Sequence, residues 1–226
     1  EYLDDKMKLL NFYCVQNEAT KKFYTDDFDR YCSLRDSDKA FFLYAGCTRK
    51  WMNKSDEGEH GSSGIFILWP KRTNEYYKTA LKAAKDGEDL NNISPIIEYR
   101  INGGATILWM GDLESDFMEN IEDDLTLPVV DILFAPHHGR DSGKIPPSLL
   151  DQMSPKVIVI GEASSRHLNY YDGYNTITQN SAGDITFECT DKLVHIYVSD
   201  YSYEVDFLEN YSCNETYGHY IGTLEL

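Results

Sequence analysis

Three short apolar runs in the second half of the chain are separated by segments with helical spacing. The runs cover about residues 105–110, 129–135 and 157–161, and each has the length of a buried strand. Apolar positions three and four apart predict helices over about 113–121 and 147–153, between the runs. This alternating order favours neighbouring parallel strands joined by right-handed crossovers. The sequence therefore predicts a mixed α/β (α+β) fold.

Two hairpins are predicted next to these parallel strands. Residues 102–104, Asn-Gly-Gly, separate an apolar run at 96–101 from the first of the three strands. Asparagine and glycine tolerate the positive φ angles that a tight turn needs. A second pair of runs, 185–189 and 193–198, is joined by the polar residues 190–192. Both pairs are expected to be antiparallel.

The first part of the chain is more polar. Apolar residues at helical spacing predict a helix over about 3–16, and three aromatic residues within the charged segment 18–38 suggest a shorter second helix. Residues 49–64 are polar and rich in glycine and serine, which is typical of a surface loop. A strand at 65–69, ended by a proline, and a helix over about 74–85 follow.

The overall charge limits the partners of this chain. It has 38 acidic and 21 basic residues among 226, a formal net charge of −17, and no long run of lysine or arginine. A field of that sign repels nucleic-acid phosphates unless metal ions or a local basic patch intervene. A polyanionic substrate would therefore be held by a metal or a partner, and not by the bulk surface.

Cysteine usage and hydropathy indicate the compartment. The five cysteines are odd in number, scattered and without a CxxC pair, which is typical of reduced thiols in the cytoplasm. No apolar run approaches the ~20 residues that a membrane-spanning helix needs. We therefore expect a cytoplasmic protein with neither a membrane segment nor a signal peptide.

Each of the three parallel runs ends in chemically reactive residues. Asp112 follows the first run, His137 and His138 follow the second, and His167 lies in the polar loop after the third. Ligands collect at the carboxyl ends of strands in α/β sheets, so these side chains are expected along one edge. A carboxylate and imidazoles that meet there suit Zn²⁺ or Mn²⁺.

Each of these residues also has a purely structural interpretation. Asp112 could serve only as the N-cap of the following helix, because aspartate caps well. The two histidines could form a buried, hydrogen-bonded turn, although Pro136 fixes the chain before them and Gly139 lets the backbone approach a ligand. His167 could be an ordinary loop histidine.

Several segments carry a resemblance to a known family. The most specific are Gly-Asp-Leu-Glu at 111–114 and, after the next strand, Pro-His-His-Gly at 136–139. The wider match comprises residues 92–94, 103–104, 108–114, 130–139, 155–160, 174–176 and 183–187. In this order the segments resemble the metallo-β-lactamase superfamily, in particular its ComEC-like (competence-type) branch, over roughly residues 60–200.

The resemblance implies a fold and a metal site. The fold would be the αβ/βα sandwich, mainly its C-terminal part, with residues 1–226 as one domain that is incomplete at the N-terminus and 1–60 as a variable helical and loop region. It implies two divalent metal ions, Zn or Mn, with Asp112 as the bridging carboxylate and His137 as a ligand of the second ion. His138 would face the substrate as a catalytic residue.

Two expected motifs are missing from the sequence. The superfamily HxHxDH signature, which supplies most metal ligands, is absent, and the resemblance places it before residue 1. The family GHP segment is not recognisable either, so His167 is a candidate catalytic substitute. Asn92 and Ser94 stand where other members place a metal-binding histidine, and we expect them to shape the pocket without binding metal.

The resemblance therefore implies a metal-dependent hydrolase, a phosphodiesterase or nuclease acting on a nucleic acid or a small ester, with this fragment alone inactive. The alternative is a non-catalytic interaction subunit of a larger complex that kept the fold. The absent HxHxDH motif and the acidic net charge favour this alternative. Hydrolysis of C–O, C–N or thioester bonds is also compatible with the fold, because fold alone does not fix the substrate. A protein partner or a missing N-terminal segment is expected in each case.

Overall fold

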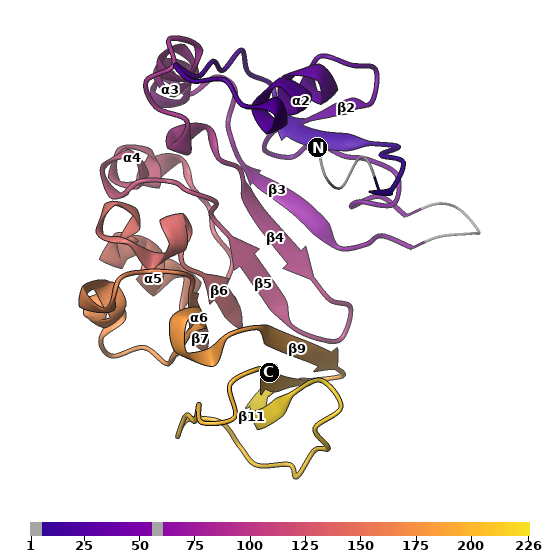
Figure 1. Cartoon of the computed structure of the whole chain (residues 1–226), viewed down its shortest axis with the longest axis vertical. Helices are drawn as coiled ribbons and strands as arrows, with labels where there is room; N and C mark the ends of the chain where they lie inside the picture. Colours follow the sequence, from indigo (N-terminus) through magenta and orange to yellow (C-terminus); the bar gives the residue numbers. More distant parts are fainter. Residues whose placement is uncertain (1–5, 56–60) are drawn as a thin grey trace.

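The chain folds into a mixed α/β architecture with three sheets (Figure 1). This computed structural model describes residues 6–55 and 61–226, apart from the side chains of Ser165, His167 and Leu168. The strands are β1 Phe12–Val15, β2 Ala40–Leu43, β3 Ile65–Trp69, β4 Ile96–Arg100, β5 Thr106–Trp109, β6 Ile132–Phe134, β7 Val157–Ile160, β8 Thr176–Thr178, β9 Ile185–Thr190, β10 Leu193–Val198 and β11 His219–Glu225. The α-helices are α2 Asp26–Arg35, α3 Glu75–Lys85, α4 Ser115–Ile121, α5 Pro147–Met153 and α6 Gln179–Ala182. The 3-10 helices are η1 Asn91–Ile93, η2 Glu122–Asp124, η3 Pro136–Gly139, η4 Asp141–Gly143 and η5 Ser165–Tyr171.

The central sheet has six strands in the order β3-β4-β5-β6-β7-β8. β3, β4 and β5 pair antiparallel, whereas β5 to β8 are parallel. The predicted hairpin at residues 96–110 and the predicted parallel strands are thus confirmed. All four residues of β7 are buried, because a central parallel strand is covered on both faces.

Helices α3, α4 and α5 cover one face of the central sheet and lie together on one side of the molecule (Figure 1). Met118 of α4 and Met153 of α5 pack with Leu108, Leu133 and Ile158, all with 0% exposure. Each helix thus contributes one apolar stripe to the core, as the sequence pattern predicted.

A buried carboxylate on the same face of the central sheet pairs with an arginine at the surface. The side chain of Glu98 has 0% exposure and accepts hydrogen bonds from both Nε and Nη2 of Arg100, the latter at 2.8 Å. Arg100 itself reaches the surface and stacks on Phe66, with the guanidinium carbon 4.6 Å from the ring centroid. The buried carboxylate therefore has one charged partner, and that partner is exposed.

The opposite face of the central sheet is covered at one end by a second sheet, in the order β11-β10-β9. The predicted hairpin over residues 185–198 forms two of these strands, with β9 and β10 antiparallel. Val194, Ile196 and Val198 point inward and pack with Ile132 and Val157 of the central sheet. This second core lies between the two sheets.

The N-terminal part of the chain differs from the prediction. Residues 12–15 form the strand β1, which pairs parallel to β2, so the predicted helix over residues 3–16 is wrong there, and its first three residues lie outside the described part. A strand forms here because pairing with β2 buries Cys14 and Val15. The second predicted helix is confirmed as α2, capped by the Thr25 hydroxyl. Within the predicted variable region, residues 6–55 therefore contain a strand–helix–strand unit, β1, α2 and β2, as well as loops.

No helix in the described ranges is both long and apolar enough to cross a membrane. All five cysteines are free thiols. They are Cys14, Cys32, Cys47, Cys189 and Cys213.

Candidate functional site

The carboxyl ends of β5 and β6 meet at a pair of tight turns. The first turn, residues 110–114, follows β5 and carries Asp112. Gly111 adopts φ +59°, and a Cβ there would lie 2.6 Å from Cβ of Ser94. The close approach of this turn to the segment before β4 therefore requires glycine.

Asn92 and Ser94 hold the Asp112 turn in place through hydrogen bonds. The Asp112 N–H donates to the Ser94 hydroxyl at 3.1 Å, and the Glu114 N–H donates to the Asn92 side-chain oxygen at 3.0 Å. The Glu114 carboxylate in return accepts from the amides of Asn91 and Asn92. These hydrogen bonds fix the position of the Asp112 turn, and a role of Asn92 and Ser94 in shaping the pocket stays a prediction.

Asp112 is not the N-cap of the following helix. Helix α4 begins at Ser115, its N-cap is Glu114, and no side chain caps it. The Asp112 side chain is 48% exposed and lies 3.9 Å from the His138 ring, measured from Oδ1 to Nε2. Its carboxylate is therefore available to a ligand.

The second turn carries the two histidines in an unusual backbone conformation. His137 (φ 48°, ψ 43°) and His138 (φ 61°, ψ 12°) are both left-handed, a region that side-chain-bearing residues rarely adopt. Such residues cost of order 1–3 kcal/mol each and cluster at functional sites. The His137 N–H donates to the Gly111 carbonyl at 2.9 Å, so the two turns are tied together.

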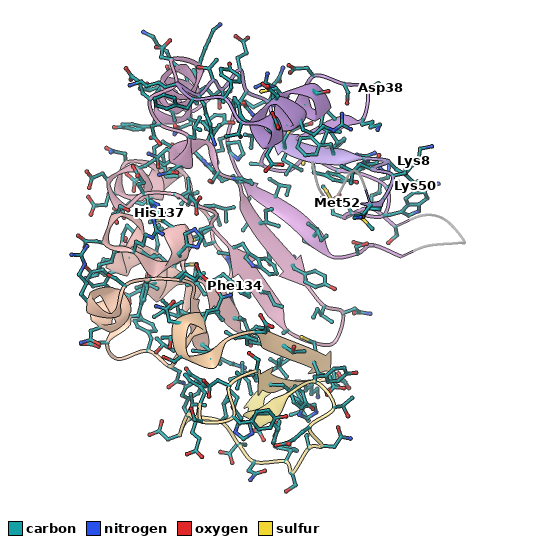
Figure 2. All side chains as sticks on the ribbon, viewed as in Figure 1. Lys8, Asp38, Lys50, Met52, Phe134 and His137 are labelled. Carbon is teal, nitrogen blue, oxygen red and sulfur yellow. The ribbon has the colours of Figure 1, made fainter. Side chains whose placement is uncertain are left out.

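The structure brings Asp112 and His138 together. His138 Nε2 lies 3.9 Å from Asp112 Oδ1, and both side chains are about half exposed, at 52% and 48%. His137 points elsewhere: its Nδ1 lies 2.9 Å from the hydroxyl of Ser142, and its ring centroid is 6.3 Å from that of His138. Both His137 and Phe134 of the neighbouring strand β6 are labelled in Figure 2. The histidine next to Asp112 is thus His138, whereas His137, which was predicted to share the metal site with Asp112, is not within ion-pair distance of it.

A cavity of about 370 Å³ opens beside Asp112 and His138. Its walls are largely apolar and come from β5, β6 and β9, with Trp109, Phe134 and Phe187 as the large rings. Trp109 and Phe134 stack at 4.9 Å between ring centroids, and Phe187 meets Phe134 edge-on at 6.1 Å. A carboxylate and an imidazole at the mouth of an apolar cavity can orient and protonate a polar group of a ligand.

Several supporting residues had no signal in the sequence. Ser142 binds His137, and Gly143 permits this contact because a Cβ there would lie 2.6 Å from Cβ of His137. Gly161, after β7, packs close to His138, with its Cβ position 3.3 Å from the His138 Cα. The sequence shows these glycines, but it does not say which residue each of them meets.

The third predicted loop forms η5, which packs against η3. The side chain of His167 lies outside the described part of the chain. Tyr171, at the end of η5, is 2% exposed, and burial raises its pKa to about 12. A hydrogen bond to Asp141 raises the pKa of Tyr170. The loop thus closes against the turn that carries the histidines.

Among the described residues, no group of three or more His, Cys, Asp or Glu side chains is arranged to hold a metal ion. Asp112 and His138 are the right donor types for Zn²⁺ or Mn²⁺, but structural and catalytic sites use three or four protein ligands. The two residues therefore fit such an ion in chemistry and fall short in number.

No protein-family model matches the chain. A search of curated proteins finds no match either.

Proposed function

We propose that the chain is a metallo-β-lactamase-type hydrolase of phosphodiesters, with its site at Asp112 and His138. The observation that carries this proposal is the approach of these side chains to 3.9 Å, on two left-handed or glycine-dependent turns at the carboxyl ends of neighbouring strands. Strain at this edge is hard to explain by packing alone. Asp112 was predicted as the carboxylate that bridges two metal ions, and His138 was predicted to face the substrate.

In this proposal His138 donates a proton to the leaving oxygen, and Asp112 holds the imidazole in position. The apolar walls at Trp109 and Phe134 exclude water on one side of the substrate. When bound, two divalent cations, Zn or Mn, would supply the activated hydroxide and neutralise phosphoryl charge. His137 would contribute its Nε2 to a metal ion, since its Nδ1 lies 2.9 Å from the Ser142 hydroxyl.

The metal requires ligands beyond the described pair, so the proposal includes a source for them. The resemblance implies an HxHxDH segment before residue 1, which would complete an αβ/βα sandwich and the ligand set. His167 stays a prediction. The free thiols support the further proposal of a reducing, cytoplasmic location.

The test measures metal content and hydrolysis of bis(p-nitrophenyl) phosphate, single-stranded DNA and RNA with Zn²⁺ or Mn²⁺. It uses residues 1–226 and the same chain extended by the sequence encoded upstream. We expect turnover in the extended chain only, and a loss of roughly 100-fold or more in Asp112→Asn and His138→Gln, the scale of general acid–base catalysis. His219→Gln, on the distant strand β11, is the matched control. Absence of turnover and of bound metal in both chains would contradict the proposal.

A non-catalytic interaction subunit is the second candidate. It is favoured by the lack of a three-ligand cluster in the described ranges. Elemental analysis separates the two: about two equivalents of transition metal in the extended chain support the hydrolase, and none supports the subunit.

A further inference from the structure

The central sheet has an uncovered strip on the face opposite its helices. One cross-strand row on this face runs Ile67, Ile97, Trp109, Phe134 and Val159, from β3 to β7. The two ends of the row are buried, with Ile67 at 3% and Val159 at 5% exposure, whereas the three residues between them are partly exposed. In Figure 1, β4 and β5 lie between the β1–β2 unit and β9. We call Ile97, Tyr99 and Trp109 the central strip.

Two hollows meet on the central strip. A groove of about 640 Å³ lies between the strip and the N-terminal unit, and Tyr13, Leu43 and Met52 are on its far wall. The cavity beside Asp112 lies on the other side, against β9. Trp109 lines both hollows, so the uncovered surface extends from the N-terminal unit to β9.

The strand that borders the strip has a free edge. β9 pairs with β10, and within the described ranges no strand pairs with its other side. Natural sheets protect such edges with lysine, proline or bulges. The β9 sequence, Ile185–Thr190, has one charged residue, Glu188, and none of these protections. Glu188 itself accepts a hydrogen bond from Tyr197. Backbone groups without a strand partner therefore lie next to partly exposed apolar side chains.

The groove has the opposite charge to the rest of the protein. Among the described residues, its lining contains Arg49 and Lys50 and no Asp or Glu, in a chain with 38 acidic and 21 basic residues. The Arg49 guanidinium stacks on Tyr13 and Phe41 at 4.9 and 4.6 Å and donates to the Asn11 side chain. It has no carboxylate partner among the described residues. An occupant of the groove would thus bring negative charge to this end.

We propose that the central strip binds a two-stranded β segment of a partner protein. The first strand would pair with the free edge of β9 and place alternate apolar side chains on Trp109. The second would cover Ile97 and Tyr99, because the strip is two strands wide, about 10 Å at the usual strand spacing. An acidic side chain of the segment would meet Arg49. Addition to an edge gives affinity through the main chain and specificity through alternate side chains. Trp109 also lines the cavity beside Asp112, so binding to the strip is measured separately from hydrolysis, without metal or substrate.

The test uses a phage-displayed library of random 16-residue peptides selected on residues 1–226, with no added metal. Enriched peptides are synthesised with a fluorescent label, and their affinity is measured by anisotropy. We expect sequences with alternating apolar residues and at least one Asp or Glu. Trp109→Ser should weaken binding at least tenfold and Arg49→Gln at least threefold, and N-methylation of alternate peptide amides should abolish it. Tyr201→Ser, an aromatic residue 66% exposed on another surface, is the matched control.

Three results would overturn the proposal. They are a selection without enrichment, peptides that bind equally to the strip variants and the wild type, and peptides that are helical when bound. If Trp109→Ser is unfolded by circular dichroism, Ile97→Lys replaces it. A labelled 20-residue oligothymidylate is tested in parallel, and its binding with the same dependence on Trp109 and Arg49 would assign the surface to nucleic acid instead. Hydrolysis without strip binding would support only the proposed function. Strip binding without hydrolysis would support only the present proposal.

Discussion

Replacing Gly111 by alanine tests how closely the Asp112 turn is packed. The new Cβ would lie 2.6 Å from Ser94 Cβ and 2.9 Å from its hydroxyl oxygen, whereas unstrained carbon contacts lie near 3.5–4.0 Å. The left-handed backbone alone costs about 1–2 kcal/mol for an alanine. Overpacking against a backbone that must shift adds about 1–3 kcal/mol. We therefore expect the free energy of unfolding to fall by about 2–5 kcal/mol.

Gly46→Ala is the matched control for this prediction. Gly46 has a similar φ of +75°, and no atom lies within 4 Å of the position of its Cβ. This variant should show the backbone cost alone, about 1–2 kcal/mol. Urea unfolding, read by circular dichroism, gives both values. In a Ser94→Gly background, where the overlapping atoms are gone, the added cost of Gly111→Ala should fall to that of Gly46→Ala. Equal costs of the two single variants in the native background would refute the close approach at Ser94.

Three further predictions concern the buried pair, a buried tyrosine and the histidine turn. Arg100→Met should destabilise the fold by about 3 kcal/mol, since it leaves the buried carboxylate of Glu98 unpaired, and Glu98→Leu added to it should restore most of the loss in urea unfolding. Burial raises the pKa of Tyr171 to about 12 from an ordinary value near 10. Its contribution to the free energy of unfolding is therefore complete below pH 10 and is lost as the pH rises toward 12. Tyr171→Phe should lessen this alkaline loss of stability, and an unchanged pH profile of unfolding would contradict the prediction. Ser142→Ala should shift the Nδ1 resonance of His137 in ¹⁵N NMR spectra and leave that of His138 in place, and the reverse pattern would exclude the contact at 2.9 Å.

Much of the central sheet could be predicted from the sequence. Helix α5 begins and ends at the predicted residues, 147 and 153, and the Asn-Gly-Gly turn joins β4 to β5. These elements have strong local signals, namely a regular apolar stripe and a turn that requires positive φ. The prediction of an N-terminal helix was wrong at residues 12–15, because the helical spacing of the apolar residues there arose by chance. Residues 12–15 instead pair with β2, a partner distant in sequence, which no local pattern reveals.

The residues of the candidate site were predicted from the sequence, but the contact between Asp112 and His138 was not. The expectation that Asp112 and the histidines lie at one sheet edge agrees with the structure. Which of two adjacent histidines faces Asp112 depends on the left-handed backbone at His137 and His138, and sequence spacing carries no information on that. The aromatic wall was also not foreseen. Phe187 comes from a strand far along the chain and reaches the cavity only after β9 has folded over the central sheet.

The hydrogen bond from the His137 N–H to the Gly111 carbonyl has a mechanical consequence. It joins the two turns directly, and the Ser94 hydroxyl anchors one of them to the segment before β4. The backbone segments that carry Asp112 and His138 are therefore held next to each other before any ligand arrives. Preorganised groups of this kind need little rearrangement on binding, so affinity is not spent on ordering them.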